Sequence, residues 1–188
     1  MKIRHSGMPD EEVWNTFFQA KEIIYRLGID QKIHDVADFG CGYGTFTIPV
    51  AKTISGFIHA IDIDPNAIDR VRQRALDEGL DNVVLVVRNI VEQGSGLEND
   101  SIDYVMLFNL LHAENPHILL DEAFRVLKPT GLIGIINWIL DASTPRGPPV
   151  EIRPTMEQCA AWCSQAGFQT DTETLELKPY HYGLVMRK

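Results

Sequence analysis

A glycine-rich run is the part of the sequence best suited to binding a ligand. Residues 36–44 read Val-Ala-Asp-Phe-Gly-Cys-Gly-Tyr-Gly, so an apolar stretch that predicts a buried strand leads directly into Gly40, Gly42 and Gly44. Glycine lets the backbone turn tightly and approach a ligand without an intervening side chain. In open α/β sheets, ligands bind where the strands end. The segment therefore predicts a binding loop between this strand and a helix expected over residues 45–53.

The charge of Asp38, two residues before the first glycine, indicates which ligand the loop binds. A carboxylate at this place repels a pyrophosphate and attracts the ammonium and sulfonium groups of S-adenosylmethionine. The spacing Gly-x-Gly-x-Gly also differs from the Gly-x-Gly-x-x-Gly of dinucleotide sites. Both observations favour S-adenosylmethionine over NAD, and they make an NAD-dependent oxidoreductase the weaker hypothesis.

Three further polar residues follow the ends of expected strands. Asp62 comes about 20 residues after the glycines, where a carboxylate can accept hydrogen bonds from ribose hydroxyls, although NAD sites share this feature. Asp64 directly precedes Pro65 and is interpreted as the N-cap of a helix. Asn89 follows the third expected strand, where its amide can read the nitrogens of adenine or can simply form a turn.

Short apolar runs alternate with helical patterns along the chain, which closes with a hairpin. Strands are predicted over residues 36–39, 57–61, 83–87, 104–108, 132–136, 172–177 and 182–186. Helices are predicted over residues 10–27, 45–53, 65–78, 116–127 and 155–166. Unbroken apolar strands are typical of a parallel sheet that is covered on both faces. The sequence thus predicts the α/β class, with a doubly wound, mostly parallel sheet of about seven strands.

We expect these elements to form a single domain over residues 1–188, a length sufficient to bury such a core. Within it, an N-terminal helical lid takes residues 1–33 and a cofactor-binding core takes residues 34–138. A loop, a helix and a C-terminal hairpin take residues 139–188.

The composition restricts the partners. The chain carries a net charge of −9, which disfavours binding to the phosphate backbone of nucleic acids. No stretch reaches the ~20 apolar residues of a membrane span, and the first residues lack the apolar segment of a signal peptide. We therefore expect a cytoplasmic protein that acts on a small molecule, and the sequence is compatible with a homodimer. The three cysteines form an odd set, which favours reduced thiols over disulfides.

Four motifs together resemble the class I S-adenosylmethionine-dependent methyltransferases: residues 38–44, 61–65, 103–112 and 126–132. The motifs most resemble those of the branch that contains the ubiquinone- and menaquinone-biosynthesis methyltransferases. The resemblance implies a Rossmann-like, three-layer fold with strand order 3-2-1-4-5-7-6, in which strand 7 runs antiparallel. It also implies S-adenosylmethionine as the cofactor and methyl transfer to a small molecule as the activity.

The same resemblance assigns the cofactor contacts. It implies that Asp38 and the glycine loop hold the methionine end, that Asp62 holds the ribose and Asn89 the adenine, and that Asn109 lies beneath the sulfonium. The full set of cofactor residues that it implies is Asp38, Phe39, Gly40, Cys41, Gly42, Gly44, Asp62, Ile63, Asn89, Ile90 and Asn109.

Methyl transfer from a sulfonium mainly needs alignment of the reacting atoms and exclusion of water. A general base is needed only where the nucleophile arrives protonated. His112 follows the fourth expected strand and is the candidate base, because the pKa of histidine lies near neutrality. The alternative is a loop histidine that shapes the site or caps the next helix.

The acceptor site is expected to come from the N-terminal helix and from the ends of later strands. Aromatic side chains of that helix can cover the methyl group or simply pack in the core. Arg146 and Arg153 can bind an anionic group or pair with surface carboxylates. The candidate acceptor residues are Trp14, Phe17, Asn137, Trp138 and Arg146. Motifs that mark a particular acceptor are absent, so the acceptor and the type of nucleophile stay open.

Two further alternatives differ in class. Cys159 and Cys163 lie one helical turn apart and can join Cys41 in an arsenite methyltransferase, or they can pack as ordinary buried thiols. No metal site is expected, because no histidine or second cysteine pair completes one. A non-catalytic S-adenosylmethionine-binding module or partner subunit is the other alternative, which turnover measurements separate from an enzyme.

Overall fold

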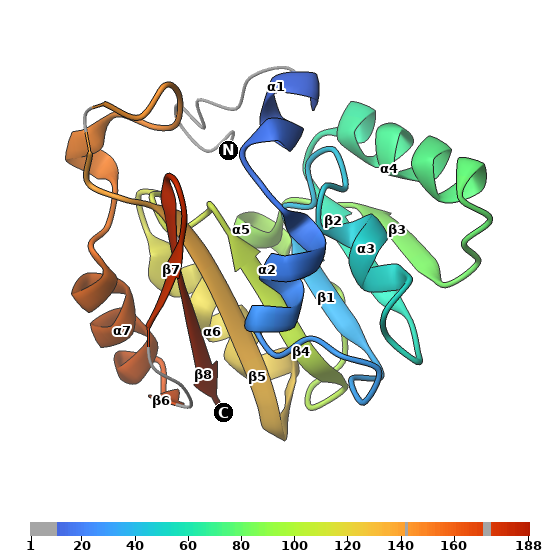
Figure 1. Cartoon of the computed structure of the whole chain (residues 1–188). Helices are drawn as coiled ribbons and strands as arrows, with labels where there is room; N and C mark the ends of the chain where they lie inside the picture. The colour runs from blue at the N-terminus through green and yellow to red at the C-terminus, as the bar shows by residue number, and fades with distance from the viewer. Residues whose placement is uncertain (1–10, 142, 171–173) are drawn as a thin grey trace.

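The computed structural model describes residues 11–141, 143–170 and 174–188 (Figure 1). Its centre is one eight-stranded sheet in the order β3-β2-β1-β4-β5-β8-β6, with β7 paired to β8. The strands β1 to β5 run parallel, and β8 runs antiparallel to β5. The strands are β1 (Val36–Phe39), β2 (Ile58–Asp62), β3 (Val83–Val87), β4 (Ile102–Phe108), β5 (Leu127–Trp138), β6 (Gln169–Thr170), β7 (Leu175–Leu177) and β8 (His181–Arg187). The predicted fold class and strand order are confirmed.

Of the sixth predicted strand, over residues 172–177, the structure shows β7. A separate two-residue strand, β6, comes before the predicted range. Both pair with β8: Thr170 lies opposite Met186, and Leu177 lies opposite His181. Thr172, where that strand is predicted to begin, lies outside the described residues.

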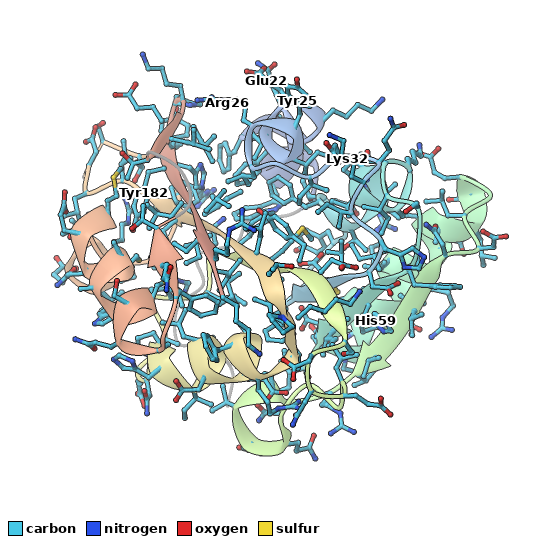
Figure 2. All side chains as sticks on the ribbon, turned by 90° about the horizontal axis from the view of Figure 1, so that it is seen from below. Glu22, Tyr25, Arg26, Lys32, His59 and Tyr182 are labelled. Atoms are coloured by element: carbon cyan, nitrogen blue, oxygen red, sulfur yellow. The ribbon has the colours of Figure 1, made fainter. Side chains whose placement is uncertain are left out.

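Helices cover both faces of the sheet. Figure 2 shows α2 on one face and α6 on the other, with the side chains of Glu22, Tyr25 and Arg26 on the outward side of α2. None of the helices in the described residues is long and apolar enough to cross a lipid bilayer. The helices are α1 (Glu11–Thr16), α2 (Ala20–Arg26), α3 (Thr47–Ala51), α4 (Pro65–Asp77), α5 (Ile90–Gln93), α6 (Pro116–Val126) and α7 (Met156–Gln165), with a short 3₁₀ helix, η1 (Val150–Ile152).

Two large clusters of buried apolar side chains lie on the two faces of the sheet. One joins Val105 of β4 with Leu120 of α6, and the other joins Met106 of β4 with Ile24 of α2. Successive residues of a strand point to opposite faces, so β4 contributes to both clusters. All four residues of β1 are buried, whereas the edge strand β3 leaves Val87 exposed. Packed side chains on both faces of the sheet therefore fix the position of the carboxyl end of β1.

The prediction of one continuous N-terminal helix over residues 10–27 is wrong, because the structure has α1 and α2 with a break between them. Asp10 lies outside the described residues. Phe17 and Phe18 form the break, and both are buried. Both rings belong to the buried cluster on the face of the sheet that α2 covers. This tertiary packing accompanies the break, and an apolar period in the local sequence does not show it.

Two smaller elements differ from prediction as well. The helix α5 was not predicted, because its four residues are too few to show a helical period. The strand β5 begins at Leu127 and runs through Pro129 and Gly131, which are predicted to lie between a helix and a strand. Its pairing with β4 is interrupted there and resumes at Leu132, so the missing N–H of the proline is tolerated.

Candidate functional site

A cavity of about 590 Å³ lies at the carboxyl ends of β1, β2 and β4. The helix α1 lies at this edge of the sheet (Figure 1), and its Trp14 is part of the cavity wall. On the other side, Glu11 of α1 forms ion pairs with Arg70 and Arg74 of α4. The short helix α1 thus contacts both the cavity wall, through Trp14, and α4, through Glu11.

Most of the predicted cofactor residues line this cavity: Asp38, Gly40, Cys41, Gly42, Asp62, Ile63, Asn89, Ile90 and Asn109. Phe39 and Gly44 are not among the residues that line it. Phe39 is fully buried in the core cluster that includes α6. Gly44 has a φ of +75° and lies against Val71 of α4, where a Cβ atom would come within 3.1 Å. Its glycine therefore lets the loop turn and pass close to α4.

Asp38 is a buried carboxyl group on the cavity wall. Its Oδ2 accepts a hydrogen bond from Oγ1 of Thr47 in α3 at 2.6 Å. Burial raises the pKa of Asp38 to about 7, and the negative charge of Asp62 adds to the effect. Among the described residues no cation forms an ion pair with Asp38. A cationic ligand in the cavity would therefore stabilise the ionised form of this carboxyl group.

Asp62 joins the glycine loop to the end of β2. Its two carboxylate oxygens accept hydrogen bonds from the backbone N–H groups of Gly42 and Asp64, each at 2.9 Å. Gly42 has a φ of +52°, which glycine adopts readily. A carboxylate has about four acceptor positions, so Asp62 keeps capacity for ribose hydroxyls. Asp64 accepts a hydrogen bond from the N–H of Asn66 at 2.9 Å and is the N-cap of α4, as predicted.

Asn89 is the N-cap of α5. Its Oδ1 accepts a hydrogen bond from the backbone N–H of Val91 at 3.2 Å. The residue therefore has the local role that its sequence position allows, and it also lines the cavity together with Ile90.

Asn109 follows β4 in a conformation that side-chain-bearing residues rarely adopt, with a φ of +57°. Its backbone N–H donates to the carbonyl oxygen of Ile136 at 2.6 Å, which fixes the loop against β5. Both polar atoms of its side-chain amide are buried and have no hydrogen-bond partner among the described residues. Backbone strain together with unpaired polar atoms on a cavity wall is typical of a ligand contact.

Eight rings form a continuous cluster, which we call the ring cluster; Trp14, Phe46 and Phe108 line the cavity wall and the others pack behind them. Trp14 lines the cavity, whereas Phe17 and Trp138, also predicted as acceptor residues, pack behind that wall. Phe18, one of the aromatic side chains of the predicted N-terminal helix, also belongs to this cluster. His181 was not predicted as a site residue, because its burial depends on contacts distant in the sequence. The ring cluster consists of Trp14, Phe17, Phe18, Phe46, Phe108, Trp138, Tyr180 and His181.

Two of the predicted acceptor residues lie elsewhere. Asn137 is buried, and its Nδ2 donates to Sγ of Cys159 in α7 at 3.4 Å. It is next to Trp138 in β5, so the two side chains face opposite sides of the sheet. Arg146 is exposed and offers its backbone carbonyl oxygen to Arg153. The structure therefore brings neither side chain to the cavity wall.

Arg153 differs from the surface ion pair that the sequence favours. The side chain is buried, and the centre of its guanidinium lies 5.5 Å from the ring centroid of Trp138. Backbone carbonyls of the loop satisfy its donors: those of Ile139, Asp141, Arg146 and Pro148. The loop thus holds a positive charge beside the ring cluster.

His112 is buried and is not among the residues that line the cavity. Its Nε2 has no hydrogen-bond partner among the described residues. Burial lowers the pKa of His112 to about 4, and the positive charge of Arg153 contributes. The ring is therefore neutral at neutral pH. The helix-cap alternative is wrong, because the residue at the N-cap of α6 is Asn115.

The three thiols do not come together. Cys41 packs with residues of α3 and α4, whereas Cys159 and Cys163 belong to the cluster on the other face that includes α6. Burial raises the pKa of Cys159 to about 11 and that of Cys163 to about 12, and it also raises the pKa of Cys41. Protonated thiols on two faces of the sheet do not form the trio that an arsenite site needs.

One group of possible metal ligands is found in the described residues, formed by His34, Asp35 and Asp103. Asp103 is already paired with Lys128 at 2.8 Å and accepts a hydrogen bond from the N–H of Asp35. His34 lies 2.9 Å from the carboxylate of Asp35. These three side chains thus already have ion-pair and hydrogen-bond partners within the protein, so their grouping does not indicate a metal.

Comparison with known proteins identifies relatives. A sterol 24-C-methyltransferase of Gibberella zeae is 29% identical over 118 residues, which cover 63% of this chain and 31% of that protein. An aklanonic acid methyltransferase of a Streptomyces strain is 26% identical over 166 residues, which cover 79% of this chain and 74% of that protein. The chain thus spans about a third of the length of the sterol methyltransferase.

Among solved structures, an S-adenosylmethionine-dependent methyltransferase from Aquifex aeolicus shares the fold, with a TM-score of 0.82 at 22% identity and coverage of 95% of this chain and 93% of that one. Residues 31–179 match the profile of a family described as a methyltransferase domain. Because this match takes in β1 to β7 and the glycine loop, most of the chain, the chain belongs to the methyltransferase domain family.

Proposed function

We propose that the protein transfers the methyl group of S-adenosylmethionine to a small-molecule acceptor. The observation that carries the proposal is Asp38, a buried carboxyl group beside the glycine loop with no cationic partner among the described residues. The ammonium and sulfonium groups of S-adenosylmethionine supply positive charge at this place, whereas the pyrophosphate of NAD adds negative charge. Membership in the methyltransferase domain family supports the same function.

The cavity offers a contact for each part of the cofactor. We assign the methionine end to Asp38 and the glycine loop, the ribose to Asp62, the adenine to Asn89, and the surroundings of the sulfonium to Asn109. The cavity volume of about 590 Å³ lies within the usual range for small-molecule and cofactor sites. All four assigned residues line that one cavity.

The bound cofactor supplies an activated methyl group, so the chain has to align the acceptor and exclude water. We assign water exclusion to residues 1–33, in which α1 bears Trp14 on the cavity wall and Glu11 pairs with α4. Where the nucleophile arrives protonated, we assign its proton to His112, whose neutral ring has an unpartnered Nε2.

The acceptor is a small organic molecule in this proposal. Two relatives are named for a sterol and for aklanonic acid, and the net charge of −9 disfavours nucleic acid. Placement in the branch of the ubiquinone- and menaquinone-biosynthesis enzymes rests on the sequence motifs. We also propose that the protein forms a homodimer. We further propose that it resides in a reducing compartment such as the cytoplasm, which its three unpaired cysteines support.

Calorimetric titration with S-adenosylmethionine, S-adenosylhomocysteine and NADH tests the cofactor. We expect micromolar binding of the first two and no binding of NADH, and the opposite preference would refute the proposal. Turnover is then measured against a panel of hydroxylated, amino and thiol metabolites with labelled S-adenosylmethionine. Tight cofactor binding without turnover of any member would identify a non-catalytic binding module instead.

A further inference from the structure

The ring cluster contains polar atoms that its apolar neighbours leave without partners. His181, the first residue of β8, lies opposite Trp138 of β5 in the antiparallel pairing, and the two ring centroids are 4.2 Å apart. The exposed fraction is 3% for His181 and 1% for Trp138. Neither ring nitrogen of His181 nor Nε1 of Trp138 has a hydrogen-bond partner among the described residues.

The neighbouring residue in β8 shows that such polar groups are otherwise satisfied. The hydroxyl of Tyr182, labelled in Figure 2, donates to the carbonyl oxygen of Pro154 at 2.8 Å and lies 3.3 Å from Sγ of Cys159. Burial of an imidazole without hydrogen bonds destabilises a fold, and an apolar ring fills similar space without that penalty. Where a sequence breaks this rule, the position is usually functional.

The available hydrogen-bond groups define the chemistry of a ligand. Burial lowers the pKa of His181 to about 3, and the positive charge of Arg153 contributes, so the ring is neutral. A neutral imidazole has one donor and one acceptor nitrogen, whereas Nε1 of tryptophan only donates. A hydroxyl group accepts one hydrogen bond and donates another. It therefore pairs with Nε1 of Trp138 and with the acceptor nitrogen of His181, two of the three unpartnered atoms, whereas a carbonyl oxygen or a methyl group does not make both bonds.

The surroundings of these two side chains are aromatic. Phe18 lies 4.5 Å from His181 and Phe17 lies 5.8 Å from Trp138, measured between ring centroids. Phe18 also contacts Trp14, which lines the cofactor cavity, so the rings connect His181 to that cavity. Stacked and edge-on ring contacts of this kind favour a planar aromatic ligand.

We propose that His181 and Trp138 form the specificity-determining end of the acceptor subsite and select a planar aromatic acceptor that carries a hydroxyl group. The inference rests on the proposed function, because it places the acceptor next to the cofactor cavity. Phe17 and Phe18 belong to the break between α1 and α2, whereas His181 and Trp138 belong to the sheet. An acceptor that reaches His181 therefore displaces the ring of Phe18 and leaves the sheet in place.

The test compares 2-naphthol with 2-methylnaphthalene, which differ only by a hydroxyl and a methyl group. Each is titrated calorimetrically into the full chain in the presence of S-adenosylhomocysteine. We expect the wild type to bind 2-naphthol more tightly, and His181→Phe to weaken 2-naphthol by about fivefold, the usual effect of one lost hydrogen bond. Binding of 2-methylnaphthalene is expected to change by less than about twofold, because an aromatic ring is retained.

His117→Phe is the matched control, since the ring of His117 also lies against a tryptophan, Trp162, at 6.2 Å but outside the ring cluster. It is expected to change the affinity for neither probe. Trp138→Phe provides the same comparison if His181→Phe does not fold. An equal loss of both probes in the His181 variant, or a wild type that does not prefer 2-naphthol, would overturn the inference. Failure of the wild type to bind S-adenosylmethionine in the same preparation would instead refute the proposed function.

Discussion

We expect Asp38 to couple cofactor binding to the release of a proton. Its pKa of about 7 means that the carboxyl group is largely protonated below neutral pH. A cationic ligand favours the ionised form, so protonation competes with binding on the acid side. We therefore expect the affinity for S-adenosylmethionine to rise as the pH increases to about 7 and then to level off. Titrations between about pH 5.5 and 8.5, in buffers of different ionisation enthalpy, measure the affinity and the proton released.

Asp38→Asn removes the titrating group, so this variant is expected to bind more weakly, by at least about tenfold at pH 8, and without the dependence on pH. Asp64→Asn is the matched control, because it removes a carboxylate from the same cavity wall while asparagine keeps the N-cap of α4. The control should retain the pH dependence. An Asp38 variant with wild-type affinity at every pH would refute the electrostatic argument for the cofactor.

His112 presents a different titration. Its pKa of about 4 leaves the ring neutral through the physiological range, so a reaction that uses it as the proton acceptor has no acid limb from His112 above about pH 5. We expect His112→Gln to lower kcat by about 100-fold for a protonated acceptor and to leave the KM for S-adenosylmethionine unchanged. Steady-state rates measured from about pH 5 to 8 check both statements. An unchanged kcat would remove His112 from the mechanism.

The residues of the cofactor cavity were predictable because their signals are local. The glycine loop, Asp62 and Asn89 each lie within a few positions of a strand end, and parallel strands bring their carboxyl ends to one edge. The roles of His181 and Arg153 were not predictable in this way. Their burial depends on pairing of β8 with β5 and on the loop over residues 143–153, which packs back on Trp138.

At the scale of elements, prediction succeeded where both ends of an element carry a signal. The helix α4 has its N-cap at Asp64, a proline at its first position and Gly79 just beyond its end, and its predicted bounds differ by one residue from the structure. The N-terminal helix had an apolar period but no internal stop signal. There, the burial of Phe17 and Phe18 in the ring cluster decided the outcome, and such tertiary packing is absent from a local pattern.

The helix α7 allows a direct test of a local signal. Oγ1 of Thr155 accepts a hydrogen bond from the backbone N–H of Gln158, whose side chain accepts one from the N–H of Thr155. Thr155→Ala removes this cap, and we expect the free energy of unfolding to fall by about 1 kcal/mol. Urea denaturation at neutral pH measures the change. Ser164→Ala, an exposed position in the same helix, is the control and should change stability by less than about 0.5 kcal/mol.

At the scale of the whole molecule, several buried ionisable groups have opposite effects on the free energy of unfolding as the pH falls. Burial depresses the pKa of His112 to about 4 and that of His181 to about 3. Between the unfolded value of about 6.5 and these folded values, the unfolded chain binds protons that the folded chain does not. Each histidine therefore lowers the free energy of unfolding by ~1.4 kcal/mol for each unit of falling pH.

Asp38 acts in the opposite sense over nearly the same range. Because its folded pKa of about 7 is above its unfolded value, the folded chain binds a proton first as the pH falls, and this raises the free energy of unfolding. One carboxyl group thus offsets one of the two histidines between about pH 6 and 4.5. The wild type should still lose stability on acidification, because the second histidine is not offset. Burial also lowers the pKa of His59, which acts in the same direction.

His181→Phe removes one of the two histidines from this balance. As the pH falls from about 6 to 4.5, we expect the variant to lose ~1.4 kcal/mol less free energy of unfolding per pH unit than the wild type does. Relative to the wild type, the variant therefore becomes more stable in acid. Urea denaturation of the wild type and of the variant at several pH values measures both slopes. Parallel slopes for the wild type and the His181 variant would show that the ring of His181 is accessible to protons in the folded chain, which contradicts its placement within the ring cluster.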